Sequence, residues 1–446
     1  MSKNMKSISF AALLIIIALI SIFIGRGLES GKVFAIGESY DELKVFAEVL
    51  SLVQKNYVEE TKTKDLVYGA IKGMLTTLDP HTSFMPPEVY KEMQVDTKGE
   101  FGGLGIQIGI KDNQLAVISP IEGTPADKAG IKAGDKIIKI DNASTKDMTL
   151  IDAVGKLRGQ KGTKVTITII REGVSEPFDV VIVREIIKIQ SIKHRMIEGN
   201  IGYIRVTQFQ EQTGEDLKKA LKKLEAEKVQ SIIMDLRNNP GGLLSMAVEV
   251  SEQFLESGKL VVFIKDRRGE KDEFTSRNTA PIKNYPMVVL VNEGSASASE
   301  IVAGALQDWG KAIVVGTQTF GKGSVQTVVP LSDGSGLRLT TARYYTPKGK
   351  SIQSTGIAPD IVIKLPVSKT AKEGKKEKTI LREKDLERHL KNDTIKEEPA
   401  PQIDEETMPL IGDEKTEKED IQLQKAIELL KTWKIFKELN PEKKAG

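Results

Sequence analysis

A serine-rich segment that joins a predicted strand to a predicted helix is the first place where this sequence could carry out chemistry. Residues 292–300 read Asn-Glu-Gly-Ser-Ala-Ser-Ala-Ser-Glu. Small residues let the backbone approach a ligand closely, and a helix N-terminus offers unpaired N–H groups and a positive dipole end. A serine placed there can attack a carbonyl, and those amides can hold the oxyanion of the acyl intermediate. An ordinary helix N-cap is the alternative that this segment alone leaves open.

A second glycine-rich segment, residues 316–324, follows the next strand and reads Gly-Thr-Gln-Thr-Phe-Gly-Lys-Gly-Ser. It matches the phosphate-binding pattern G-x-x-x-x-G-K-[ST] as far as the lysine, but Gly323 stands where a hydroxyl is needed, and strand formers follow it. Nucleotide binding is therefore disfavoured. Burial would lower the pKa of Lys322, and a neutral lysine beside a serine can act as its general base. Gln326 would lie on the same face of an extended strand and could align the amine.

The composition of the 446 residues excludes several other kinds of site. The chain has no cysteine, which removes disulfides, thiolate metal sites and cysteine nucleophiles. Its three histidines are too few for a His-rich metal centre, and none stands in a recognisable triad context. A net charge of +3 gives no electrostatic case for nucleic acid. We therefore expect no metal, no cofactor and no nucleic-acid partner.

The first 35 residues resemble an export signal. Lys3 and Lys6 precede an apolar run from Ile8 to Ile24, and basic residues follow it. The sequence predicts that residues 1–35 are a signal peptide or membrane anchor, with an uncleaved anchor preferred because the apolar run is long. The bulk of the protein is then expected in the cell envelope outside the cytoplasmic membrane, in a periplasmic or other extracytoplasmic space.

Beyond that segment the pattern predicts a multidomain α/β protein. Apolar residues at three- and four-residue spacing indicate a helical region, and short β-branched runs broken by glycine then indicate a small β-rich module. Alternating strands and helices follow, and the apolar runs Leu260–Ile264 and Met287–Val291 are typical of strands covered on both faces. A polar, charged stretch and a terminal amphipathic helix end the chain. The corresponding ranges are 38–95, 96–185, 190–366, 367–420 and 421–440.

Four motifs in this order together carry a family resemblance. They are Asp79-Pro80-His81-Thr82, Asp235-Leu236-Arg237-Asn238-Asn239-Pro240-Gly241-Gly242, Ser295-Ala296-Ser297-Ala298-Ser299-Glu300, and Phe320-Gly321-Lys322-Gly323 with Gln326. This combination resembles the carboxy-terminal-processing proteases, the tail-specific peptidases with a Ser–Lys dyad, from about residue 40 to residue 366.

The resemblance implies a role for each matching residue. Ser297 corresponds to the nucleophile, Lys322 to the general base and Gln326 to the group that orients the lysine. Ala298 and the Gly241-Gly242 turn correspond to the oxyanion donors, with the choice between the two glycines left open. The core is expected to resemble the crotonase/Clp-like α/β fold.

The β-rich module resembles a PDZ domain. Gly103, Leu104, Gly105 and Ile106 match its carboxylate-binding loop, where successive N–H groups can form a nest for an anion and the next strand can accept a peptide by β-augmentation. Arg158 stands where it could read the charge of a peptide, although a solvated surface arginine is the alternative.

The leading hypothesis is thus an exported serine endopeptidase that recognises exposed protein C-termini. A crotonase-type acyl-thioester enzyme would not need export or a PDZ module. A catalytically inert PDZ scaffold of the envelope would not need Ser297, Lys322 and Gln326 together. The helical start and the terminal amphipathic helix also suggest self-association, and the N-terminal segment suggests membrane attachment.

Overall fold

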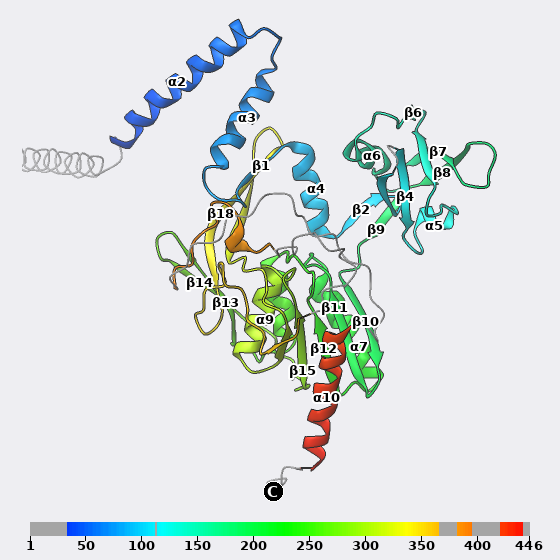
Figure 1. Cartoon of the computed structure of the whole chain (residues 1–446), viewed down its shortest axis with the longest axis vertical. Helices are drawn as coiled ribbons and strands as arrows, with labels where there is room; N and C mark the ends of the chain where they lie inside the picture. Colours follow the sequence, from blue (N-terminus) through cyan, green and yellow to red (C-terminus); the bar gives the residue numbers. More distant parts are fainter. Residues whose placement is uncertain (1–33, 112–113, 365–380, 395–419, 440–446) are drawn as a thin grey trace, which may run out of the picture. The chain divides into compact units, whose positions relative to one another are not determined.

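The computed structural model describes residues 34–111, 114–364, 381–394 and 420–439 (Figure 1). The chain divides into two compact units, Met1–Met74 and Leu75–Gly446. The predicted signal or anchor falls outside the described residues, except for the two positions at its end. Within the described ranges, no helix has both the length and the apolar character to cross a bilayer.

Helices form the described part of the first unit, as the sequence predicts. Helix α2 spans Phe34–Asn56 and helix α3 spans Thr63–Leu75. Helix α2 exposes an apolar stripe at helical spacing, made of Leu43, Phe46, Val49 and Leu52.

The second unit begins with strand β1 (Ser83–Met85) and helix α4 (Pro87–Lys98), which starts at a proline in its first turn and ends at Gly99. Gly99 adopts φ 71°, the left-handed conformation that commonly ends helices. The region predicted to be helical thus also contains a short strand.

The predicted PDZ module that follows is built from antiparallel strands around its own apolar core. Its main sheet has the order β3-β4-β5-β7-β8, with β6 paired to β5, while β2 pairs with β9. The predicted hairpin is present as β3 and β4. The bounds are β2 Glu100–Gly103, β3 Ile106–Lys111, β4 Gln114–Pro120, α5 Pro125–Lys128, β5 Lys136–Ile140, β6 Ala143–Ser144, α6 Leu150–Leu157, β7 Lys164–Ile170, β8 Phe178–Val183 and β9 Glu185–Lys188.

A six-stranded sheet organises the α/β core, in the order β10-β11-β12-β15-β16-β19. Only the β10–β11 pair is antiparallel, so the carboxyl ends of β11, β12, β15 and β16 lie along one edge. The bounds are β10 Ile192–Ile197, β11 Ile201–Val206, α7 Thr213–Ala226, β12 Ser231–Asp235, α8 Leu244–Glu252, β15 Met287–Val291, α9 Ala298–Asp308, β16 Ile313–Gly316 and β19 Ile361–Val362.

A second sheet packs with this core and contains strands from distant parts of the sequence. It has the order β1-β18-β13-β14, with β17 also paired to β18, and its bounds are β13 Leu260–Asp266, β14 Lys271–Thr275, β17 Ser324–Pro330 and β18 Gly336–Tyr345. The apolar run at 260–264 therefore does not join Met287–Val291 in one sheet. Strand β13 lies between β14 and β18 and pairs antiparallel with both. Its Val261 and Val262 are buried in the core cluster, which accounts for the apolar run.

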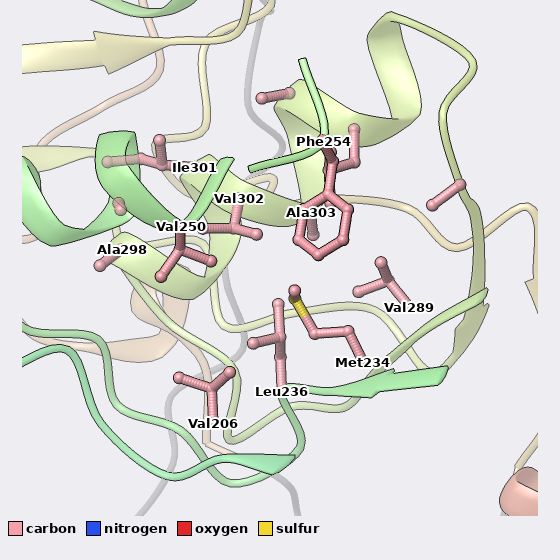
Figure 2. Close-up of a cluster of buried hydrophobic side chains, with 14 of the residues drawn as sticks. Val206, Met234, Leu236, Val250, Phe254, Val289, Ala298, Ile301, Val302 and Ala303 are labelled. Carbon is pink, nitrogen blue, oxygen red and sulfur yellow. The ribbon is translucent and has the colours of Figure 1, made fainter. Parts of the chain in front are cut away.

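The largest apolar cluster lies between these elements. Figure 2 shows Met234 of β12, Val302 of α9 and Phe254, which follows α8, pointing into it. Helix α9 is buried along nearly its whole length, so its N-terminus is held rigidly against the sheet edge.

Two segments after residue 380 contact the core. The predicted charged linker, 367–420, includes a described segment at 381–394 with a short 3-10 turn, η1 (Glu383–Asp385), and a buried Glu383 and Asn392. The terminal amphipathic helix is α10 (Ile421–Leu439), which buries Leu423, Ala426 and Ile427 against the main sheet.

Candidate active site

The three serines of the serine-rich segment have different environments. The Ser295 hydroxyl donates to the Leu236 carbonyl at 2.8 Å, and the Ser299 hydroxyl donates to the Asn239 carbonyl at 2.9 Å. Both side chains are completely buried. Ser297 is partly exposed, directly precedes α9, and has φ 54° and ψ −113°, a strained backbone that persists where the fold enforces it. The structure thus leaves Ser297 as the candidate nucleophile.

The turn that follows β12 is fastened to the serine segment. The Asn292 side chain accepts from the Asn238 amide and donates to the Asn238 side chain, both at 2.8 Å, while the Ala296 amide donates to the Asn239 carbonyl at 3.0 Å. A Cβ on Gly241 would lie 2.9 Å from the Cβ of Ser297, so only glycine fits there. Two sequence motifs that are more than fifty residues apart thereby form one wall.

The backbone amides of this wall separate the two candidate glycines. The Gly241 N–H already donates to the Asn239 side chain at 2.9 Å. Within the described chain, the N–H groups of Gly242 and Ala298 donate to no protein group, and Ala298 is the first residue of α9. Gly242 is exposed and Ala298 is buried. Both amides are available to an oxyanion.

Lys322 lies in the loop between β16 and β17, and its side chain is largely desolvated. Burial lowers the pKa of Lys322 below its ordinary value of 10.5, and the positive charge of Arg338 acts in the same direction. The carboxylates of Glu383, Glu300 and Asp79 oppose this shift. A lysine in such surroundings loses its proton more readily than one in water.

Glu300 connects the serine and lysine segments. Its fully buried carboxylate accepts from the amides of Ser297 at 2.8 Å and Lys322 at 3.0 Å. The Gly321 amide at 2.7 Å and the Thr319 hydroxyl at 2.6 Å donate to its other oxygen. Burial raises the pKa of Glu300 to about 7, while these four hydrogen bonds favour the charged form. One carboxylate thus sets the backbone positions of both candidate dyad residues.

Gln326, on β17, has a buried acceptor with no hydrogen-bond donor among the described residues. Its Nε2 donates to the Thr340 hydroxyl at 2.8 Å and to the Ser324 hydroxyl at 3.3 Å, while Oε1 has no partner. The Thr340 hydroxyl in turn donates to Asp79 at 3.1 Å. The hydrogen bonds of Nε2 therefore fix the orientation of the Gln326 side-chain amide, and its oxygen is free to accept from another donor.

The side chains of Ser297 and Lys322 are not hydrogen-bonded to each other in the described structure. Among the described residues, no hydrogen bond joins the Ser297 hydroxyl to the Lys322 amine or the Gln326 oxygen to that amine. Catalytic hydrogen bonds are often long without substrate and shorten in the complex.

In the predicted carboxylate-binding loop, Gly103 ends strand β2, and the amides of Leu104 and Gly105 follow it. The carbonyls of Leu104 and Gly105 accept from Ala126 and Ile121, whereas their own N–H groups donate to no group in the described chain. Gly105 has φ 79°, and a Cβ there would lie 2.3 Å from Thr124. Ile106 begins β3, which among the described strands pairs with β4 alone and so lies at the edge of this sheet.

Arg158 is engaged with the protein itself. It ends helix α6, forms an ion pair with Glu92 of α4, and stacks on Phe101 with 4.4 Å between the guanidinium carbon and the ring centre. Its role in peptide binding stays a prediction.

Three groups near the site were missed by the sequence reasoning. Glu300 was noted only as part of a motif, although its position three residues after Ser297 matches a capping box. His81 was set aside because it fits no triad, and its Nε2 lies 2.7 Å from Glu383. Glu383 gave no signal, because it lies in a stretch of charged residues.

Comparisons with known proteins agree with this arrangement. Residues 200–363 match the family described as Peptidase family S41, residues 117–171 match a PDZ domain, and residues 29–89 match the activating protease CtpB N-terminal domain.

Individual relatives extend over most of the chain. The carboxy-terminal-processing protease of Bartonella bacilliformis is 48% identical over 337 residues, which cover 74% of this chain and 76% of that protein. The carboxy-terminal processing protease CtpA of Bacillus subtilis is 39% identical, covering 70% of this chain and 67% of that protein. The solved photosystem II D1 C-terminal processing protease is 31% identical with a TM-score of 0.43, covering 72% of this chain and 93% of that one.

Proposed function

This chain belongs to peptidase family S41, the family of the carboxy-terminal-processing proteases, and is a serine-type peptidase; we propose that Ser297 and Lys322 form its catalytic dyad. The observation that carries the proposal is the shared anchor at Glu300, which holds the backbone of a strained, partly exposed serine and of a desolvated lysine. The neighbouring serines are occupied by structural hydrogen bonds, which supports Ser297 as the reactive one.

In the proposed reaction, neutral Lys322 takes the hydroxyl proton of Ser297 as the serine oxygen attacks the scissile carbonyl. The N–H groups of Gly242 and Ala298 stabilise the oxyanion, because neither donates to a described residue, while that of Gly241 donates to Asn239. The lysine then gives its proton to the leaving amine. Water, activated by the same lysine, hydrolyses the acyl-enzyme and restores the serine.

Gln326 is the proposed orienting group of the lysine. Its side-chain NH2 group donates to Thr340 and Ser324, so the amide oxygen, which has no partner among the described residues, can accept a hydrogen bond from the Lys322 amine. This places the amine by a hydrogen bond and does not require a third charged group.

The proposed substrates are polypeptides with an exposed C-terminus. The open amides of Leu104 and Gly105 suit a carboxylate, and the free edge of β3 suits the residues that precede it. The predicted signal or anchor at residues 1–35 supports an extracytoplasmic location, which fractionation of cells that express the full chain tests directly.

The test is incubation of the full chain with an unfolded model protein, such as reduced and alkylated lactalbumin, followed by fragment masses. The matched control is the Ser297→Ala variant, with Ser299→Ala as a second serine variant outside the proposed chemistry. Cleavage that disappears only in Ser297→Ala supports the dyad. Persistent cleavage in that variant contradicts it, and absence of cleavage in every form would favour the inert scaffold.

A further inference from the structure

The segment at 381–394 is brought beside the lysine loop from beyond the part of the chain that matches the peptidase family. We propose that this segment is a working part of the active site, in which Glu383 acts as a positioning residue that holds the Lys322 loop in place. The inference rests on the proposed dyad, because it concerns the placement of the general base.

Glu383 is fixed on three sides by other parts of the protein. Its side chain is fully buried, with one carboxylate oxygen 2.7 Å from His81 Nε2 and the other accepting from Gln353 Nε2 at 2.9 Å. Its backbone N–H donates to the Phe320 carbonyl at 3.2 Å. A buried carboxylate in a polar tail is costly unless it is paired, so these contacts indicate a defined docking position.

The contacts reach both ends of the lysine loop. Phe320, which accepts from the Glu383 amide, precedes Lys322 by two residues. On the other side, Gln353 accepts from the Gly323 amide at 3.1 Å with the same side chain that donates to Glu383. The loop is therefore held by Glu300 of helix α9 from one direction and by the Glu383–Gln353 pair from the other.

The rest of the segment secures this pair. The Asn392 side chain donates to the Gln353 carbonyl at 2.6 Å, and the Leu390 carbonyl accepts from Gln353 Nε2 at 2.9 Å. Leu390 also accepts from the Ser354 hydroxyl at 3.3 Å, and the Ser354 amide donates to the Gly321 carbonyl at 2.8 Å. The docked segment and the lysine loop thus share the strip at Gln353-Ser354 as a common support.

Glu383 also contributes charge at the lysine. Four charged groups act on the Lys322 amine: Glu383 from the docked segment, Arg338 from β18, Glu300 from α9 and Asp79 from the turn before β1. His81 forms a hydrogen bond with Glu383 itself. Among the charged groups Glu383 has the largest effect, and it raises the pKa of Lys322 against the lowering by burial. Removing this charge therefore lowers the pKa of the lysine further.

The test measures kcat, KM and the pH profile of peptide cleavage for the full chain carrying Glu383→Ala or Glu383→Gln. Glu383→Ala removes the side-chain hydrogen bonds to His81 and Gln353. It is expected to lower kcat about 100-fold with little change in KM, since misplacement of a catalytic group by about 1 Å can cost that much. Glu383→Gln keeps the shape and can bond to Gln353 and His81, so it is expected to recover most of the loss at high pH. Its acid limb is expected to move to lower pH, because the carboxylate charge that raises the pKa of Lys322 is gone.

Controls separate this inference from folding and from the dyad itself. Glu387→Gln changes an exposed carboxylate of the same segment and is expected to leave the profile unchanged. His81→Gln is expected to leave the acid limb in place, because the limb belongs to the lysine. Equal movement of the limb in His81→Gln, no movement in Glu383→Gln, or full kcat in Glu383→Ala would each overturn the inference. If Ser297→Ala is inactive and Glu383→Ala is fully active, the proposed dyad stands and the positioning role of Glu383 is rejected.

Discussion

At the scale of single residues, the candidate site depends on a backbone conformation that a non-glycine residue rarely adopts unless its surroundings enforce it. Ser297 has a positive φ, and its amide is held by the carboxylate that also accepts from the Lys322 amide. Strain of this kind costs of order 1–3 kcal/mol and persists where the surroundings enforce it. The reactive geometry is therefore provided by buried partners of the two residues as much as by the residues themselves.

The first prediction concerns the dyad. Ser297→Ala and Lys322→Ala are each expected to abolish turnover, and the double variant is expected to be no worse, because members of one catalytic unit are not additive. His194→Ala is the matched control and should retain wild-type kcat. Initial rates on a fluorogenic peptide measure all four. Additional loss in the double variant would show that the two residues act independently.

The second prediction concerns pH. Because Lys322 acts in its neutral form, kcat/KM is expected to rise with pH through the lowered pKa of the lysine and to reach its plateau below pH 10.5. Below about pH 7, Glu300 also takes up a proton and weakens its hold on both segments, so the acid limb should steepen there. A profile measured from pH 5 to pH 10 checks both features. An activity that falls as pH rises across this range contradicts a lysine base.

At the scale of elements, sheet edges and loops determine what can bind. Strand β3 is an edge strand, because no second strand pairs with it in the part of the chain that the structure describes. In the same described part, the amides of Leu104 and Gly105 in the preceding loop donate to no group. Edge strands offer a ready template for an added strand. The proposed carboxylate recognition and the proposed strand addition thus belong to adjacent parts of one module.

The third prediction follows for peptide choice. A peptide with a free carboxylate and an apolar last residue is expected to bind best, because burying that side chain contributes roughly 1.5–3 kcal/mol. Amidation of the terminus should weaken binding about tenfold or more, since a charge-assisted hydrogen bond contributes about 1.5–3 kcal/mol. A final Asp or Lys should also weaken binding, because the burial of an apolar side chain is lost. Fluorescence anisotropy with the full-length Ser297→Ala variant measures affinity without cleavage. Equal affinity for the acid and the amide excludes carboxylate recognition.

At the scale of the whole molecule, the end of the chain stabilises its centre. Asp420, at the start of α10, forms two hydrogen bonds with Arg237 at 2.8 and 2.7 Å, and Arg237 also pairs with Asp235 at the end of β12. The same helix places Leu423 and Ile427 against the main sheet. The motif that contains the proposed oxyanion turn is therefore tied to the last described helix.

The fourth prediction concerns this docking. Leu423→Ala is expected to lower the free energy of unfolding by about 2–4 kcal/mol, because it leaves a cavity in a buried cluster. Trp433→Ala, on the exposed part of the same helix, is the matched control and should have little effect. Urea unfolding followed by far-ultraviolet circular dichroism measures both variants. Equal midpoints for Leu423→Ala and the wild type would show that α10 does not stabilise the core.

The sequence by itself determined the local elements and the chemistry on offer. Periodic apolar residues defined α2, α3 and α10, glycine-punctuated β-branched runs defined the PDZ strands, and four motifs indicated the peptidase family. These signals are readable because they depend on neighbours a few residues apart. The family resemblance then singled out Ser297, Lys322 and Gln326, and their catalytic roles remain predictions that the kinetic tests above examine.

Only the tertiary structure decided which distant groups meet. It placed the apolar run at 260–264 in an antiparallel sheet. The sequence could not predict this placement, because a buried strand has the same apolar pattern in either kind of sheet. The tertiary structure showed that the amide of Gly241 is engaged while that of Gly242 is open. It also brought Glu383 from a charged tail to His81, about three hundred residues earlier in the chain. No local pattern reports such a pairing, because a buried carboxylate and a solvated one look the same in sequence, and only their packed partners distinguish them.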